Sequence, residues 1–258
     1  MMHLVKPYFK FLFKSTNEHG VHSPFVFDLV AKCLYDKTPY PEYKMLSDFR
    51  KSLLQNQHEI KVTDFGAGSR VFKSDSRKIS AIAKNAGISA GRAKLLFRLV
   101  KYFNPGSILE IGTSVGLATA ALRLGSKRAT ITTIEGCRRT MTVAKEQFSL
   151  SGFPKTNFVA AEFGEAIMEL PSGTKFDFVY FDGNHTKAAT LQYFNLLLPT
   201  ATNDTLWIFD DIHWSPEMEE AWESIRKNPN VTVTIDTFQW GLVFFRKQQE
   251  KEHFVIRA

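Results

Sequence analysis

From residue 107 onward, short apolar runs of strand length alternate with longer stretches whose apolar residues recur at helical spacing. Five strands are each followed by a helix, in the pairs 107–112 with 116–125, 130–135 with 139–152, 157–162 with 164–171, 176–182 with 187–199, and 205–211 with 216–229. Because a crossover through a helix leaves consecutive strands parallel, this alternation predicts a parallel sheet covered by helices on both faces.

The last two strand-like runs follow a different pattern. Residues 231–238 and 240–247 are both rich in β-branched and aromatic residues, and only a short link separates them. A link of this length cannot carry the chain back across a sheet, so the last strand should run antiparallel. The predicted fold is therefore α/β: a doubly wound, seven-stranded, mostly parallel sheet with an antiparallel last strand and an N-terminal helical cap.

The front of the chain differs in both pattern and charge. Its helical segments are separated by Pro, Gly and polar breaks, which predicts a basic, mainly helical cap over residues 1–87 and an α/β domain over residues 88–258. Residues 1–107 contain 18 Lys and Arg against 8 Asp and Glu, whereas the net charge of the whole chain is +7. Such a field favours an anionic partner, which can be a lipid surface, nucleic acid or an acidic substrate, or it only keeps the helix faces solvated.

Two features bear on the compartment. No apolar run reaches the roughly 20 residues that cross a bilayer, and charges interrupt the apolar residues of the opening segment, which does not resemble a secretory signal. Cys33 and Cys137 have no ligand-like spacing, which fits a reducing compartment. We expect a cytoplasmic protein.

Residues 4–14 mix aromatics with lysines, as interfacial helices do, but a buried docking segment or a homodimer contact explains the same pattern.

Two glycine turns compete for the role of a nucleotide loop. Such a loop needs glycine for close backbone approach, then a helix, then a second strand that ends in an acid about 20 residues on. Gly112 meets these conditions, because the strand 130–135 ends in Glu135. No comparable strand follows Gly66. The turn Asp64–Arg70 is left with two interpretations: a nest of amides for an anion, or a tight packing turn.

The spacing inside the turn at Gly112 argues against a dinucleotide. Gly112 and Gly116 do not complete the G-x-G-x-x-G of nicotinamide enzymes. The stretch ILEIGTSVGLATAAL, the acid Glu135, and the segments FDFVYFDGNH and IFDDIHW resemble class I S-adenosylmethionine-dependent methyltransferases. The similarity covers roughly residues 88–246 and is greatest to the catechol and caffeoyl-CoA O-methyltransferase-like group. It implies a Rossmann-like methyltransferase domain over residues 88–258.

The resemblance implies a binding site for S-adenosyl-L-methionine. The residues at the matching positions are Glu110, Gly112, Thr113, Ser114, Gly116, Glu135, Glu162, Phe163 and Asp182. Glu110 would lie near the methionine moiety, Glu135 would bind the ribose hydroxyls, and Glu162 and Phe163 would contact adenine. Phe163 also suits a core position.

The acceptor side of the predicted site combines acids with a histidine. Asp182 and His185 are the catalytic candidates, because an imidazole that titrates near neutral pH can take the proton of a hydroxyl acceptor. Asp182, Asp210 and Asp211 follow strand ends and offer oxygen ligands to Mg²⁺ or another divalent cation. The catechol-type pattern has Asn where Asp211 stands, and these aspartates would otherwise cap helices or orient the acceptor. His213 is expected near the acceptor pocket.

The predicted function is S-adenosylmethionine-dependent O-methylation of a small-molecule hydroxyl, with divalent-metal assistance left open. Two alternatives come from other classes. One is a nicotinamide-dependent oxidoreductase, and the other is an RNA- or membrane-associated protein that uses the basic cap. A homodimer is also left open.

Overall fold

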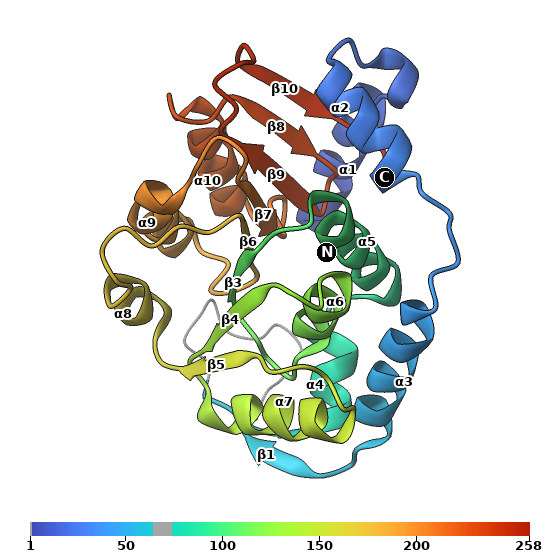
Figure 1. The fold of residues 1–258 in the computed structure, drawn as a ribbon, viewed down its shortest axis with the longest axis vertical. Helices are drawn as coiled ribbons and strands as arrows, with labels where there is room; N and C mark the ends of the chain where they lie inside the picture. The colour runs from blue at the N-terminus through green and yellow to red at the C-terminus, as the bar shows by residue number, and fades with distance from the viewer. Residues whose placement is uncertain (1, 64–73) are drawn as a thin grey trace. The chain divides into compact units, whose positions relative to one another are not determined.

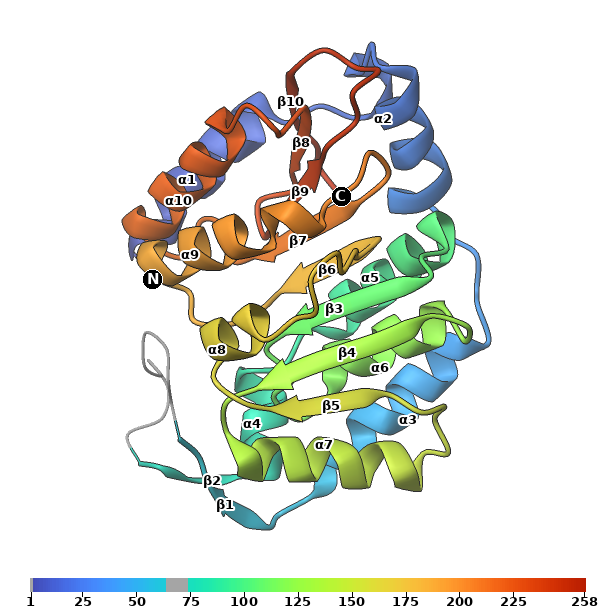
Figure 2. The same ribbon diagram turned by 60° about the vertical axis from the view of Figure 1, so that its left-hand side comes forward.

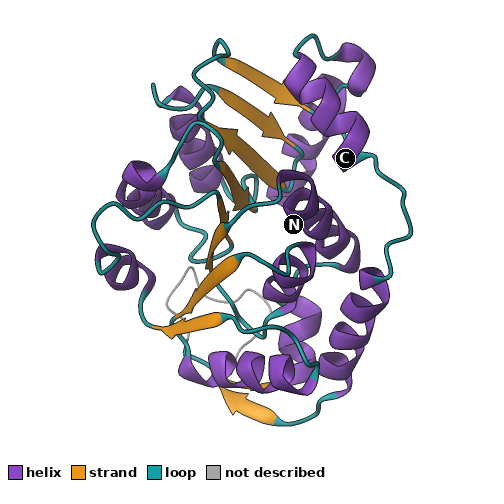
Figure 3. Ribbon diagram, viewed as in Figure 1, coloured by secondary structure: helices purple, strands orange, loops and turns teal. Residues whose placement is uncertain are grey.

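The computed structural model describes residues 2–63 and 74–258, and it divides the chain into two compact units. The central unit is Lys37–Ala166, and the terminal unit combines Met1–Asp36 with Ile167–Ala258. Strands flanked by helices make up most of both units (Figure 3). The predicted division into a cap, residues 1–87, and a methyltransferase domain, residues 88–258, stays a prediction.

The central unit is built on three parallel strands. Its elements are α3 (Glu42–Gln55), β1 (Glu59–Lys61), β2 (Ser76–Lys78), α4 (Ile79–Asn85), α5 (Ala90–Phe103), β3 (Ser107–Ile111), α6 (Leu117–Gly125), β4 (Thr130–Glu135), α7 (Arg138–Leu150), β5 (Asn157–Ala160) and the start of α8 (Phe163–Met168). The strand order is β3-β4-β5, with Ile111 opposite Ile134 and Glu135 opposite Ala160 (Figure 2). The carboxyl ends of β3 and β4 are therefore adjacent.

Local sequence explains where these elements begin and end. Ser89 caps α5 by accepting the backbone N–H of Arg92 at 3.3 Å, and α5 ends at Asn104, whose φ of 45° is left-handed. All nonterminal residues of α6 are buried, as expected for a helix rich in Ala and Leu that packs between a sheet and other helices.

The terminal unit carries the remaining strands (Figure 1). Its elements are α1 (Met2–Lys14), the short helices η1 (Glu18–Gly20), α2 (Pro24–Leu29) and η2 (Val30–Leu34), then β6 (Phe178–Phe181), α9 (Lys187–Leu197), η3 (Leu198–Thr200), β7 (Leu206–Asp210), α10 (Pro216–Lys227), β8 (Val233–Asp236), β9 (Trp240–Phe244) and β10 (Glu252–Val255). The strand order is β10-β8-β9-β7-β6. Every residue of β6 and β7 is buried, as is typical of parallel strands covered on both faces.

The predicted doubly wound α/β class is confirmed. Within the described residues all seven predicted strands are present, and β9 runs antiparallel to both of its neighbours, β7 and β8, as predicted for the last strand. The strand β10 was not predicted and pairs in parallel with β8. The antiparallel pair β1–β2 was not predicted either. No helix in the described part of the chain is long and apolar enough to cross a membrane.

A buried arginine holds the turn between α6 and β4. Arg123 is 2% exposed, and its guanidinium donates to the carbonyls of Ser126 at 3.3 Å, Lys127 at 3.4 Å and Ala129 at 3.0 Å. Replacing Arg123 by Met removes these donors and leaves buried carbonyls unpaired. We expect the free energy of unfolding, measured in urea, to fall by about 2 kcal/mol. Arg128→Met is the matched control, because Arg128 is exposed. Equal losses in both variants would contradict this role.

Candidate active site

The turn between β3 and α6 has a backbone that favours glycine. Gly112 and Gly116 adopt φ values of 101° and 86°, and Ser114 between them is also left-handed, with φ of 49°. A Cβ added to Gly116 would lie 3.2 Å from a ring carbon of Phe148, tighter than usual contacts. The backbone N–H of Gly112 donates to the carbonyl of Ile134 at 3.0 Å, which ties the turn to β4. Both glycines therefore have a conformational reason to be there.

Glu135, at the end of β4, is bonded directly to this turn. Its Oε2 accepts the backbone N–H of Ser114 at 2.7 Å, and its Oε1 accepts that of Cys137 at 2.9 Å. The carboxylate thus links the turn to the start of α7 and has a fixed orientation. Each carboxylate oxygen can accept more than one hydrogen bond, so Glu135 retains capacity for hydroxyl donors of a ligand.

Glu110 is fully buried next to the turn. Thr119 and Thr133 each donate a hydroxyl to Oε2 at 2.6 Å, and Oε1 is buried with no hydrogen-bond partner. Because the hydroxyl hydrogen of Thr133 goes to Glu110, Thr113 must donate to Thr133 in the contact between their hydroxyls. Burial raises the pKa of Glu110 to about 7, the two threonine hydrogen bonds oppose the rise, and the charge of Glu135 adds to it. A cationic ligand group would stabilise this carboxylate.

Glu162 and Phe163 lie at the start of α8. Oε2 of Glu162 accepts the backbone N–H of Glu165 at 3.0 Å, which caps the helix, and the side chain of Phe163 is buried. Their predicted contact with adenine stays a prediction.

In the terminal unit, Asp182 and His185 lie in the loop between β6 and α9. Nε2 of His185 is 3.6 Å from Oδ1 of Asp182, and both side chains are partly exposed. Between them, Asn184 has a left-handed φ of 62° and donates its side-chain amide to the hydroxyl of Tyr193 at 3.1 Å. Thr186 then caps α9. The loop is thus anchored on both sides of the acid–imidazole pair.

Asp210 is the last residue of the neighbouring strand, β7, and Asp211 follows it. Because Phe181, the last residue of β6, pairs with Phe209 in parallel register, Asp182 and Asp210 come next at the carboxyl ends of two adjacent strands. Both oxygens of Asp210 are engaged: Oδ1 accepts the backbone N–H of Asp211 at 2.9 Å, and Oδ2 accepts the hydroxyl of Tyr180 at 3.2 Å.

Asp182, Asp210 and Asp211 are the predicted ligands of a divalent cation. The described residues contain no group of three or more His, Cys, Asp or Glu side chains placed to hold a metal ion. Asp182, Asp210 and Asp211 therefore do not form such a group as arranged here, and the left-handed φ of 54° at Asp211 separates its side-chain direction from that of a regular strand residue. Metal assistance stays a prediction.

His213 forms an ionic cluster whose partners the sequence did not reveal. Its Nδ1 is 2.9 Å from Oε1 of Glu219, its Nε2 is 2.9 Å from Oδ2 of Asp236, and its ring stacks on Phe238. Burial alone would lower the pKa of His213, but the hydrogen bonds and charges of Asp236 and Glu219 outweigh burial and raise it. Both ring nitrogens are therefore committed to carboxylates, and the expected place of His213 near the acceptor pocket stays a prediction.

The structure brings the predicted residues together in two groups. In the central unit, Glu135 bonds Ser114, and Thr113 connects to Glu110 through Thr133. In the terminal unit, Asp182 pairs with His185. Sequence reasoning missed Thr133 and Thr119, although a threonine inside the apolar helix α6 was a usable signal for Thr119. The turn Asp64–Arg70 lies outside the described residues.

A family model matches the part of the chain that contains these two groups of residues. Residues 109–212 match the model of a family described as a methyltransferase domain. This range includes both Glu135 and the Asp182–His185 pair. The comparison with curated proteins gave no match.

Solved structures with the same fold span most of the chain. A methyltransferase from Podospora anserina with bound S-adenosylhomocysteine is 14% identical, with a TM-score of 0.63, and the match covers 88% of this chain and 97% of that one. An O-methyltransferase from Bacillus cereus is 17% identical over 85% and 97% of the two chains, with a TM-score of 0.54. The O-methyltransferase TomG from Streptomyces achromogenes is 19% identical over 63% and 82%, with a TM-score of 0.55.

At these identities the structural matches establish the fold, and the family model adds the domain type. Together they confirm the resemblance inferred from the sequence: residues 109–212 match a family described as a methyltransferase domain, and the chain shares its fold with solved methyltransferases.

Proposed function

We propose that the protein transfers the methyl group of S-adenosyl-L-methionine to a hydroxyl oxygen of a small molecule. The observation that carries this proposal is the turn from Gly112 to Gly116, bonded through Ser114 to the strand-end acid Glu135, inside the matched methyltransferase domain. When bound, the cofactor supplies a methyl group on a sulfonium, which leaves as a neutral thioether.

The central unit has the side chains to hold this cofactor. Glu135 would accept the ribose hydroxyls, and the unpartnered, buried Oε1 of Glu110 fits a cationic group of the methionine moiety. Glycine at positions 112 and 116 lets the backbone approach the ligand closely. Thr113 and Ser114 fix the turn, and Glu162 and Phe163 are the candidates for adenine.

The candidate base is His185, which pairs with Asp182 in the terminal unit. Asp182 faces Nε2 of His185, which leaves Nδ1 of the ring to accept the proton of the acceptor hydroxyl. Loss of that proton gives the oxygen the lone pair that forms the new bond to carbon. Asp182 stabilises the resulting imidazolium until His185 releases its proton to solvent.

Oxygen is the favoured acceptor atom for two reasons. The pairing of an acid with an imidazole suits an acceptor that must lose a proton before it reacts, as a hydroxyl must. TomG, which was crystallised with S-adenosylmethionine, and the Bacillus cereus protein, crystallised with S-adenosylhomocysteine, are both O-methyltransferases. A cytoplasmic location belongs to the same proposal, and Cys33 and Cys137, both buried and free, are compatible with it.

Titration calorimetry with S-adenosylhomocysteine tests the donor site. Replacing Glu135 by Ala removes the acceptor for the ribose hydroxyls, and we expect binding to weaken by about 1–3 kcal/mol, roughly 5- to 150-fold. Glu146→Ala, an exposed acid on α7, is the matched control. Thermal melting of both variants separates lost affinity from lost folding.

Two results of this titration would overturn the donor assignment. One is unchanged affinity in Glu135→Ala. The other is tight binding of NADH by the wild-type protein together with no heat from S-adenosylhomocysteine, which would return the nicotinamide alternative.

A further inference from the structure

The helix α1 packs on the terminal unit through only part of its surface. Phe11 is buried, and the rings of Tyr8 and Phe11 lie 4.9 and 5.5 Å from the ring of Phe238. At its carboxyl end, the guanidinium of Arg257 donates to the carbonyl of Leu12 at 3.2 Å. These contacts fix which side of α1 faces the protein.

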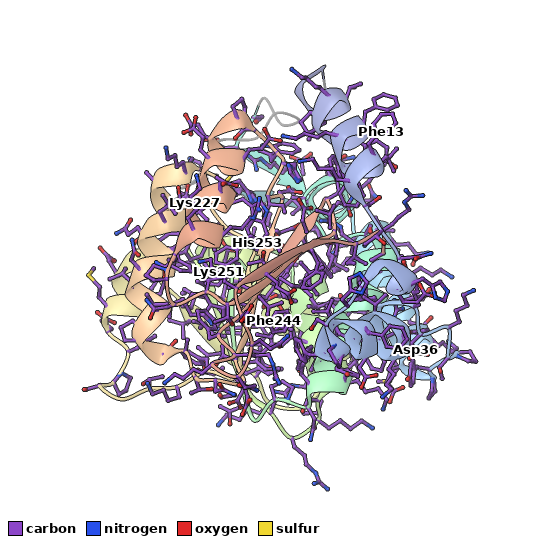
Figure 4. All side chains as sticks on the ribbon, turned by 90° about the horizontal axis from the view of Figure 1, so that it is seen from above. Phe13, Asp36, Lys227, Phe244, Lys251 and His253 are labelled. Atoms are coloured by element: carbon purple, nitrogen blue, oxygen red, sulfur yellow. The ribbon has the colours of Figure 1, made fainter. Side chains whose placement is uncertain are left out.

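The opposite side of α1 exposes large apolar side chains. Val5, Phe9 and Phe13 are 54%, 55% and 88% exposed, and their spacing of four residues places them on one stripe of the helix. In Figure 4 the ring of Phe13 lies at the edge of the molecule, pointing away from the strand that carries Phe244. Exposure of three neighbouring apolar side chains on one stripe indicates a contact surface.

Positive charge runs beside this stripe. Lys6, Lys10 and Lys14 are exposed, repeat at the same spacing of four residues, and therefore follow an adjacent line along the helix. Residues 2–14 include no Asp or Glu. The α1 outer face, defined as Val5, Phe9 and Phe13 with these three lysines, is therefore apolar in the middle and cationic along one edge.

We propose that the α1 outer face docks on an anionic lipid surface, with the helix lying in the plane of the interface. The two phenylalanines and the valine enter the boundary between headgroups and acyl chains, and the lysine ammonium groups reach the lipid phosphates. The apolar side chains supply the burial, and the lysines supply selectivity for negative lipids. Neither α1 nor any other described helix spans the bilayer.

The charge and the apolar stripe of the α1 outer face favour a lipid surface over two other partners, a second copy of the chain and nucleic acid. In a second copy bound through the same face, the lysines of both copies would approach each other, and α1 contains no carboxylate to compensate them. Nucleic acid would satisfy the lysines but would not explain an aliphatic Val5 and two aromatic rings aligned on one stripe. A lipid surface explains both the apolar stripe and the adjacent line of lysines.

Sedimentation with vesicles tests the apolar part of the face. We expect the protein to bind vesicles of phosphatidylcholine containing about one third phosphatidylglycerol, and to bind pure phosphatidylcholine much more weakly. The double variant Phe9→Ser, Phe13→Ser should lower the partition coefficient at least about tenfold. The control, Leu150→Ser with Met168→Ser, removes two apolar side chains that are 82% and 64% exposed elsewhere, and should bind like the wild type.

A second set of variants tests the charged edge. Replacing Lys6, Lys10 and Lys14 by Gln should weaken binding to the anionic vesicles by about tenfold or more, and high salt should do the same to the wild type. The control replaces Lys51, Lys84 and Lys145, three exposed lysines of the central unit, by Gln and leaves the same net charge. All variants keep the buried contacts of α1, and circular dichroism checks that they fold.

Three outcomes would overturn the proposal. One is no binding to anionic vesicles, and another is equal loss in the α1 variants and their controls. The third is a different occupant: a dimer, seen by light scattering, or a complex with mixed tRNA that the α1 variants abolish while vesicles are not bound.

Discussion

Replacing His185 by Ala is expected to lower kcat by about 10²- to 10⁴-fold, the usual contribution of a positioned general base. The imidazole lies 3.6 Å from Asp182 and is the side chain that we propose takes the proton of the acceptor. Affinity for S-adenosylhomocysteine should change little, because His185 is not among the residues that we propose hold the cofactor. Initial rates with a catechol as the probe acceptor, alongside calorimetry, measure both quantities.

Asp182→Asn sharpens the test of this pair. The amide keeps the shape of Asp182 but cannot stabilise the imidazolium, so kcat should fall while the variant folds normally. His58→Ala, an exposed histidine of the central unit, is the control. If neither His185→Ala nor Asp182→Asn affects turnover, the assignment of the base is wrong.

The wild-type protein is expected to lose stability as the pH rises, and the variant Glu110→Gln is expected to lack this loss. The ordinary pKa of a glutamate is 4.5, and burial raises that of Glu110 to about 7 in the folded protein. The neutral form is therefore favoured by folding. The contribution of this neutral carboxyl group to the free energy of unfolding is fully present below about pH 4.5 and is lost as the pH rises through about 7. The difference between the two pKa values corresponds to about 3 kcal/mol.

Urea unfolding of the protein without cofactor, between about pH 4.5 and 8, measures this effect. The wild type should lose free energy of unfolding relative to Glu110→Gln across that range, with a plateau above about pH 7. Glu146→Gln controls for the removal of an exposed acid. Parallel curves for the wild type and Glu110→Gln would contradict the raised pKa. Binding of S-adenosylmethionine should likewise weaken below about pH 7 in the wild type only, if Glu110 meets a cationic group of the ligand.

The parts of the fold that could be predicted depend on local sequence. Strand β6 and the first four residues of β7 are apolar or aromatic because both faces are buried, and the helices between strands keep a regular spacing of apolar residues. The strand β10 escaped prediction because it is short, its sequence is EHFV, and its pairing with β8 depends on a register that no local pattern encodes. The turn of π-helix at Val30–Leu34 is equally hidden in an ordinary helical pattern.

The candidate site also has parts that local sequence predicts and parts that depend on packing. Gly112 and Glu135 could be found because a turn and a strand end have local signatures, and their joint position follows from parallel strands. The partners of Glu110 could not be fixed, because Thr133 faces it only through the exact register of β3 and β4. His213 was expected near an acceptor pocket, but its bonds to Glu219 and Asp236 depend on how α10 and β8 pack.

The contacts between α1 and residues 256–257 have a consequence for synthesis on the ribosome. Thr16 forms a β-bridge with Ile256. Arg257 donates to the carbonyl of Leu12, which lies 245 residues earlier in the chain. A nascent chain that has emerged only as far as residue 36 has none of these partners, so α1 cannot make these contacts until residues 256 and 257 have been synthesised. In that interval the exposed aromatic side chains of α1 are open to binding by a chaperone.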